Sequence, residues 1–94
     1  MGRKAHVLSK HQVEYGTSLP LEYFEEMLAE IERNPKYEDT VTYVNENNTE
    51  YELSREALEE LSQDETVTDS LRSFAQNLLD SGDPNHDCVR VEVF

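Results

Sequence analysis

The chain has 94 residues, and its 21 Asp and Glu against eight Lys and Arg give a formal net charge of −13 at pH 7. A chain of this length has room for one folded domain, which we place over residues 1–94. Within it, residues 1–4 are the ones that could be disordered. The single cysteine excludes an intrachain disulfide and favours a reducing compartment. Because no apolar run approaches the roughly 20 residues that span a bilayer, and no signal peptide is recognisable, we expect a cytoplasmic protein.

The charge is unevenly distributed along the chain. Residues 22–65 hold fifteen acidic residues against three basic ones, whereas residues 1–13 hold three basic residues and no acidic one. The acidic segment of residues 22–65 is expected to repel nucleic acids and anionic membranes and to attract basic protein surfaces. Adaptation to high salt would produce a similar composition, and the sequence does not separate the two explanations.

The first predicted element is a β-strand from Ala5 to Tyr15, in which apolar and polar residues alternate at both ends. Leu8 and His11 interrupt the alternation, which predicts a bulge or an edge strand. Residues 16–18 are of turn-forming types and are expected to end the strand.

The next element, from Pro20 to Arg33, has the clearest helical pattern in the chain. Proline suits the first turn of a helix, and the residue before Pro35 avoids helical angles, so we expect the helix to end at Asn34. Its apolar residues recur at helical spacing and are Leu21, Phe24, Met27, Leu28 and Ile31.

Two β-rich runs separated by a two-residue turn predict a β-hairpin, made of Thr40–Glu46, the turn Asn47-Asn48 and Thr49–Leu53. This turn pairs Val44 with Tyr51, which gives the hairpin one apolar face. Val41 and Tyr43 then point to the opposite, wetter face.

The remaining residues predict two helices and a final strand. Ser54 is a suitable N-cap for the first helix, and Thr66 is expected to start the second, which ends at Gly82. The last strand, Cys88–Phe94, alternates valine with charged residues. The order β-α-β-β-α-α-β indicates an α+β domain with a four-stranded, mainly antiparallel sheet and helices packed on one face.

Carboxylates spaced three and four residues apart line the first two predicted helices and form the candidate partner-binding site. They are Glu22, Glu25, Glu26 and Glu30 on the first helix and Glu56, Glu59 and Glu60 on the second. Tyr23 and Tyr43 lie off the apolar faces and could serve as aromatic anchors among these charges. A solvated helix face is the ordinary alternative for such a run of charges.

Fixed carboxylates on rigid elements can imitate nucleic-acid phosphates and occupy the cationic groove of another protein. We therefore expect a non-enzymatic, acidic protein-binding module. It would inhibit or regulate a basic nucleic-acid-binding protein, a nuclease or a toxin, in the manner of a DNA mimic or an immunity protein. The expected partner is a basic protein surface, with no direct binding of nucleic acid or membrane.

An alternative function is that of a small structural or assembly subunit. Such a subunit would form a homodimer through an edge strand, either Ala5–Tyr15 or Cys88–Phe94. The valines of the last strand could then pair with those of a second copy.

A third possibility is chemistry in the polar loop from Asp80 to Cys88. Asp83, His86 and Asp87 could bind an ion, but their spacing matches no metal-binding motif. A Cys-His pair across the sheet is conceivable, yet no third catalytic group and no Gly-rich phosphate loop are recognisable. We therefore expect neither an enzyme nor a bound cofactor.

Overall fold

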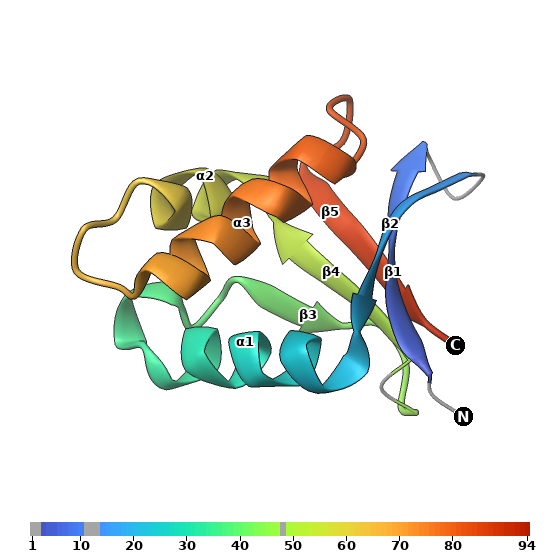
Figure 1. Ribbon diagram of the computed structural model, residues 1–94, viewed down its shortest axis with the longest axis horizontal. Helices are drawn as coiled ribbons and strands as arrows, with labels where there is room; N and C mark the ends of the chain where they lie inside the picture. The colour runs from blue at the N-terminus through green and yellow to red at the C-terminus, as the bar shows by residue number, and fades with distance from the viewer. Residues whose placement is uncertain (1–2, 11–13, 48) are drawn as a thin grey trace.

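The computed structural model describes residues 3–10, 14–47 and 49–94, and these residues form an α+β domain (Figure 1). His11 of the first predicted strand and Asn48 of the predicted hairpin turn lie outside the described residues. The predicted fold class is confirmed, with five strands in place of four among the residues described. None of the described helices is both long enough and apolar enough to cross a membrane.

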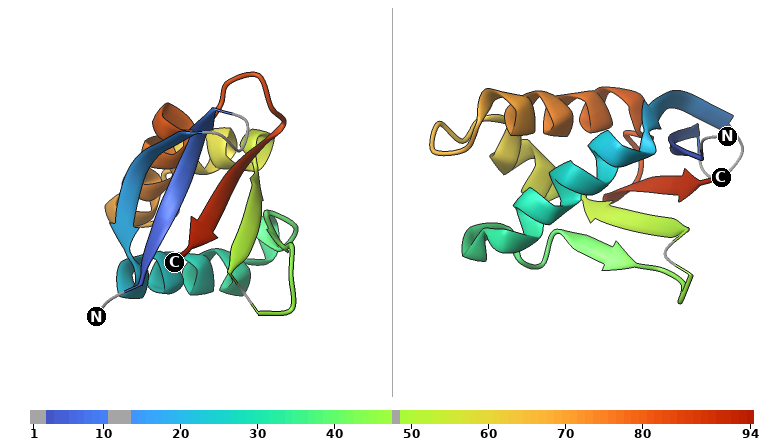
Figure 2. Two further views of the ribbon diagram at one scale, coloured as in Figure 1. Left: turned by 90° about the vertical axis from the view of Figure 1, so that its right-hand side faces the viewer. Right: turned by 60° about the horizontal axis from the view of Figure 1, so that its bottom comes forward.

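The described strands form one antiparallel sheet in the order β2-β1-β5-β4-β3, with the helices on one of its faces (Figure 2). The strands are β1 (Lys4–Lys10), β2 (Glu14–Pro20), β3 (Val41–Tyr43), β4 (Glu50–Ser54) and β5 (Cys88–Val93). The helices are α1 (Leu21–Arg33), α2 (Arg55–Ser62) and α3 (Asp69–Ser81), with a short 3-10 helix, η1, at Pro35–Tyr37.

The first predicted strand is divided into two strands that pair as a hairpin. Ala5 of β1 lies opposite Leu19 of β2, and the register shifts at Leu8, as the interrupted alternation predicted. Residues 16–18, which we expected to end a strand, belong to β2. Pairing with β1 and the burial of Leu19 outweigh the turn-forming tendency of these small residues.

α1 confirms the first predicted helix, which begins directly after Pro20. Four residues of its apolar stripe are buried: Phe24, Met27, Leu28 and Ile31. Asn34 ends the helix, and its backbone N–H donates to the Ile31 carbonyl at 3.1 Å. The Asn34 side chain then accepts the Lys36 N–H at 3.0 Å, which starts η1.

The hairpin of β3 and β4 has a different register from the predicted one. Tyr43 lies opposite Tyr51, where a two-residue turn would have placed Val44. The connecting loop is longer because the Asn45 side chain closes it, accepting the Thr49 N–H at 3.0 Å and donating to the Thr49 hydroxyl at 2.7 Å. A slip of one residue moves every side chain to the other face, so Tyr43 lies on the helix side and its predicted orientation is wrong.

Both remaining helices begin at capping side chains. The Ser54 hydroxyl accepts a backbone N–H at 3.2 Å at the start of α2, as predicted. α3 begins after Thr68, whose hydroxyl accepts the Leu71 N–H at 3.2 Å, and not at the predicted Thr66. Thr66 has another role, because its N–H and its hydroxyl both donate to the Asp64 carboxylate.

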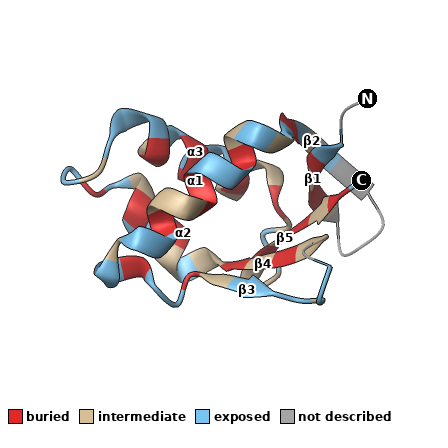
Figure 3. Ribbon diagram, turned by 90° about the horizontal axis from the view of Figure 1, so that it is seen from below, coloured by how far each residue is buried: buried red, intermediate tan, exposed pale blue. Residues whose placement is uncertain are grey.

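β5 is the central strand of the sheet, between β1 and β4. The prediction that Cys88–Phe94 is an edge strand is therefore wrong. The two edge strands are β2 and β3, so of the described residues in the predicted strand Ala5–Tyr15 only the last two, which belong to β2, lie at an edge. Val89, Val91 and Val93 of β5 are buried in the core. Figure 3 marks part of β5 as buried. The helices contribute the other large core side chains, among them Phe24, Ile31, Leu58, Leu61, Phe74 and Leu78.

Candidate functional site

The four carboxylates predicted on α1 do not share one surface. Glu22, Glu25 and Glu26 are exposed, whereas Glu30 is half-buried. Glu26 and Glu30 lie beside Arg33 and line a shallow hollow with the first residues of α3. Successive helical residues are about 100° apart, so Glu25 points away from this hollow, toward β3 and β4.

Tyr23, the first predicted anchor, is half-buried between α1 and α3. Its ring packs edge-to-face against Phe74, with the ring centroids 5.8 Å apart. Burial raises the pKa of the Tyr23 hydroxyl. Tyr23 therefore belongs to the packing between two helices, and much of its surface is already in contact within the domain.

Tyr43, the second predicted anchor, lies at the free edge of the sheet and is 43% exposed. Its hydroxyl donates to both carboxylate oxygens of Glu32 on α1, at 2.9 and 2.8 Å. Its ring packs edge-to-face against Tyr51, with the centroids 5.3 Å apart. Burial, followed by the hydrogen bond to Glu32 and the charge of that carboxylate, raises the pKa of Tyr43 to about 12.

Glu25 and Glu32 flank this pair of tyrosines. Burial raises the pKa of Tyr51, and the negative charges of Glu25 and Glu32 add to the increase, while the positive charge of Arg3 opposes it. The two carboxylates are seven residues apart, which is two turns of helix or about 10 Å along one side of α1. They therefore line the side of α1 that faces β3 and β4.

The carboxylates of α2 lie near a second group of acids that the sequence analysis did not single out. Glu56 and Glu60 share a polar hollow with Glu38 and Asp39, which directly precede β3. Glu59 shares a second hollow with Asp87, and Glu56 lines both hollows.

The exposed acidic residues on the segments next to β3, together with Tyr43, form a surface that we call the acidic belt. Its members are Glu25 and Glu32 of α1, Glu38 and Asp39 before β3, Glu56 and Glu60 of α2, and Tyr43 of β3. All six carboxylates are exposed. Lys36 lines the same hollow as Glu38, but its ammonium pairs with the Asp64 carboxylate at 3.2 Å. The belt is thus a display of negative charge beside an exposed aromatic ring.

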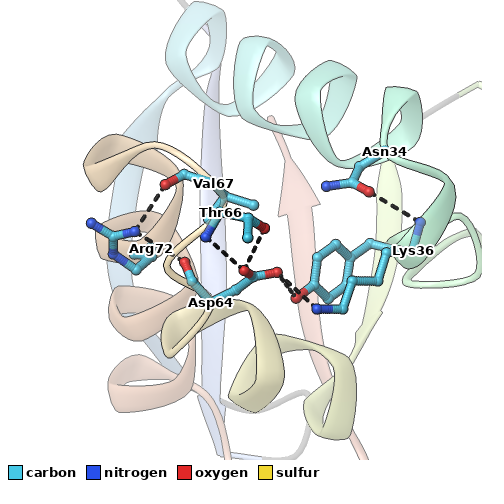
Figure 4. A network of polar contacts seen from close by, with 7 residues as sticks. Asn34, Lys36, Asp64, Thr66, Val67 and Arg72 are labelled. Carbon is cyan, nitrogen blue, oxygen red and sulfur yellow. Dashed lines mark hydrogen bonds and ion pairs between the residues drawn. The ribbon is translucent and has the colours of Figure 1, made fainter.

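A buried network holds η1, and with it the residues before β3, against the loop between α2 and α3 (Figure 4). The Asp64 side chain is only 5% exposed. It accepts hydrogen bonds from the Tyr37 hydroxyl at 2.6 Å, the Lys36 ammonium at 3.2 Å, and the Thr66 N–H and hydroxyl at 2.8 and 2.5 Å. The bonds from Thr66 and Tyr37 hold the pKa of Asp64 far below its usual range.

Arg72 closes the same loop from the α3 side. Its Nη1 donates to the carbonyls of Asp64 at 3.0 Å and Val67 at 2.8 Å (Figure 4). Its Nη2 pairs with Asp69. Burial and the hydrogen bond to Asp64 raise the pKa of Tyr37. Because each carboxylate oxygen of Asp64 already accepts two hydrogen bonds, Asp64 is suited to positioning η1 and not to accepting a proton from a substrate.

The polar loop before β5 is organised by an arginine. Arg55 of α2 donates from Nε to the His86 carbonyl at 3.0 Å and from Nη2 to the Asp83 carbonyl at 2.8 Å. Among the residues that the structure describes, no three His, Cys, Asp or Glu side chains are grouped closely enough to hold a metal ion.

The single cysteine is half-buried at the start of β5. Burial and the neighbouring Glu52 raise the pKa of the Cys88 thiol, which disfavours the nucleophilic thiolate. The register places Glu92, and not Cys88, opposite His6 on β1. The Cys-His pair considered from the sequence is therefore not formed by His6.

Comparison of the chain with models of protein families, with curated proteins and with solved structures finds no match. The charge and geometry of the acidic belt are therefore the features that point to a function.

Proposed function

We propose that the protein is a non-enzymatic acidic module that binds a basic surface of another protein and thereby inhibits or regulates it. The observation that carries this proposal is the acidic belt, in which six exposed carboxylates lie on the segments next to β3 and one exposed tyrosine, Tyr43, lies beside Glu32. The partner class that fits best is a nucleic-acid-binding protein, a nuclease or a toxin, because these proteins carry cationic grooves. We place the interaction in the cytoplasm, since the chain has one cysteine and no disulfide-forming pair.

Electrostatics and packing would contribute to binding in different ways. The net charge of −13 would attract a basic partner over long range and accelerate the encounter. The contact itself needs groups held in fixed positions, and the Asp64 network supports this by anchoring η1 next to Glu38 and Asp39. Tyr43 offers an exposed aromatic surface beside Glu32, and aromatic side chains are common anchors in protein interfaces.

The belt is a better candidate than the outward face of α1, which the sequence also proposed. On that face Arg33 lies beside Glu26 and Glu30, and Glu30 is half-buried. A positive charge among two carboxylates weakens the attraction to a cationic groove. On the belt side of α1, Glu25 and Glu32 are both exposed and face the tyrosines of the sheet.

The experiment compares two double variants of α1, which change the net charge by the same amount on two different sides of the helix. Glu25→Lys with Glu32→Lys alters the belt, and Glu22→Lys with Glu26→Lys alters the exposed outward side. Each is used with the wild type to capture proteins from an extract of the source cells at low salt. Bound protein is eluted in steps to about 0.5 M salt, where attraction between exposed charges is largely screened.

We expect the wild type and the Glu22/Glu26 variant to retain the same basic protein, and the Glu25/Glu32 variant to lose it. Purified partner should bind the Glu25/Glu32 variant at least about tenfold more weakly. Equal retention by all three proteins would exclude the belt as the contact. Loss with the Glu22/Glu26 variant alone would move the site to the outward face of α1.

A further inference from the structure

The backbone of β3 offers hydrogen-bonding groups that no other described strand uses. The Val44 N–H donates to the Glu50 carbonyl at 3.0 Å, and the Ser54 N–H donates to the Thr40 carbonyl at 2.9 Å. In an antiparallel pair, such bonds alternate along the strand, so the N–H and C=O groups of Val41 and Tyr43 point away from β4. β3 is the last strand on this side of the sheet in the part of the chain that the structure describes (Figures 2 and 3).

β3 has only three residues, and short length is one of the devices that limit pairing at an exposed edge. Lysine, proline, bulges and a covering element are other devices that protect native edge strands. The other edge, β2, includes Pro20 and has an irregular register with β1. β3 carries neither lysine nor proline, and Tyr43 and the adjoining Val44 are 43% and 41% exposed.

The charges around β3 determine what kind of strand could pair with it. On the helix side lie Glu25 and Glu32, and before the strand lie Glu38 and Asp39. On the other face, Glu52 lies opposite Thr42. A second copy of this chain would bring the same carboxylates into contact with themselves. A segment with Lys or Arg at every second position would present all of them on one face, because residues i and i+2 of a strand share a face. On the helix side they would meet Glu25 and Glu32.

We propose that the partner contributes an extended, Lys- or Arg-bearing segment that pairs with β3 and extends the sheet by one strand. This inference rests on the proposed function and specifies the contact that the acidic belt makes. Backbone hydrogen bonds to Val41 and Tyr43 supply affinity that does not depend on the partner's side chains, and the belt selects basic segments. The exposed side chains of Tyr43 and Val44 pack against the apolar parts of the added strand.

The first test is amide hydrogen exchange in the wild-type protein with a defined probe. The probe is an eight-residue peptide of alternating lysine and valine, and the control is a peptide of alternating lysine and proline, in which the prolines cannot donate to a strand. The lysine-valine peptide should slow exchange at Val41 and Tyr43 by about tenfold, the effect of one hydrogen bond. The Thr42 amide, which faces β4, should change little with either peptide.

The second test compares Tyr43→Pro with Tyr43→Ala. Both remove the aromatic ring, but only proline removes the outward N–H, and edge strands tolerate proline where the N–H faces solvent. The Ala variant should bind the peptide at least about tenfold more tightly than the Pro variant. Thermal unfolding of both variants without peptide checks that they remain folded to a similar extent.

The outcomes separate this inference from the proposed function. In one outcome, the Glu25/Glu32 variant loses the partner, the Pro and Ala variants bind the peptide equally, and exchange of the β3 amides is unchanged. The acidic belt would then be the contact surface, and strand addition would be wrong. If the β3 amides become protected but the Glu25/Glu32 variant keeps the cellular partner, strand addition stands and the belt fails. A wild-type dimer in sedimentation experiments that the Pro variant abolishes would show that a second copy occupies β3, and would overturn the basic segment.

Discussion

Asp64 accepts four hydrogen bonds at a nearly dry site, and it needs its negative charge to do so. Because those bonds lower its pKa from the ordinary 3.8, the folded state favours the charged form. The resulting stabilisation is complete above the ordinary carboxyl pKa. It is lost as the pH falls below about 4 toward the lower pKa of the folded state.

We therefore expect Asp64→Asn to lower the melting temperature at pH 7, and the difference from wild type to shrink below about pH 4. The measurement is thermal unfolding of both proteins between pH 7 and pH 2. Asp69→Asn, which removes an exposed carboxylate paired with Arg72, serves as the control. A difference that stays constant across this range would contradict the role assigned to the Asp64 charge.

Tyr43 provides a second prediction at the residue scale. Burial and Glu32 together raise its pKa to about 12, so Glu32→Gln should lower that pKa toward the ordinary value of 10 without reaching it. The burial contribution remains in the variant. NMR titration of the Tyr43 ring carbon measures the shift directly, and Glu22→Gln should leave it unchanged. An unaltered pKa in the Glu32 variant would show that the two side chains are not in contact in solution.

At the scale of elements, the end of α3 depends on space beside β5. Gly82 is buried, and a Cβ added to it would lie 2.9 Å from Cγ2 of Val89 and 3.0 Å from the Leu78 carbonyl oxygen. Its φ of −79° is open to any residue, so the requirement is for room and not for a left-handed backbone. The sequence correctly predicted that Gly82 ends the helix, whereas this packing reason depends on a strand that follows later in the chain.

Gly82→Ala should therefore destabilise the protein by about 1–3 kcal/mol, the usual cost of overfilling a packed site. Chemical denaturation of the variant measures the loss. Ser73→Ala, at an exposed position of the same helix, should be neutral or slightly stabilising. A Gly82 variant as stable as wild type would mean that α3 and β5 can separate without cost.

The elements differ in how far their sequences predicted them. All three helices were recognised because their apolar residues repeat at helical spacing. α1 begins one residue after the predicted Pro20, and α3 begins after Thr68 and not at Thr66. The β3–β4 register could not be inferred, because it depends on the Asn45 side chain closing a longer loop. β2 was missed since Gly16, Ser18 and Pro20 resemble a turn, and pairing with β1 makes them a strand.

The candidate site was predicted in part. Glu25, Glu56, Glu60 and Tyr43 belong to the acidic belt, whereas Glu22, Glu26 and Glu30 lie on other sides of α1. Glu59 lines a second hollow that Glu56 also borders. Glu32 could have been found, because it follows Glu25 by two helical turns. Glu38 and Asp39 could not, since their position beside α2 depends on η1 being held by Asp64.

At the scale of the whole molecule, the net charge of −13 sets up repulsion within the folded domain. Raising the salt from about 0.01 M to about 0.15 M shortens the screening length from about 30 Å to about 8 Å, so we expect the melting temperature to rise. The increase should be smaller for the Glu22→Lys and Glu26→Lys variant, which carries less net charge. Thermal unfolding at both salt concentrations tests this, and an equal increase in the two proteins would contradict repulsion as the cause.

The central place of β5 has a consequence for synthesis on the ribosome. β5 lies between the β1–β2 hairpin and the β3–β4 hairpin, yet it comprises residues 88–93. Before those residues leave the exit tunnel, the two hairpins have no strand to join them, and the apolar faces of the helices have no complete sheet to cover. Folding of the sheet therefore has to follow the synthesis of β5, and a nascent chain interrupted before β5 would be a target for chaperones and proteases.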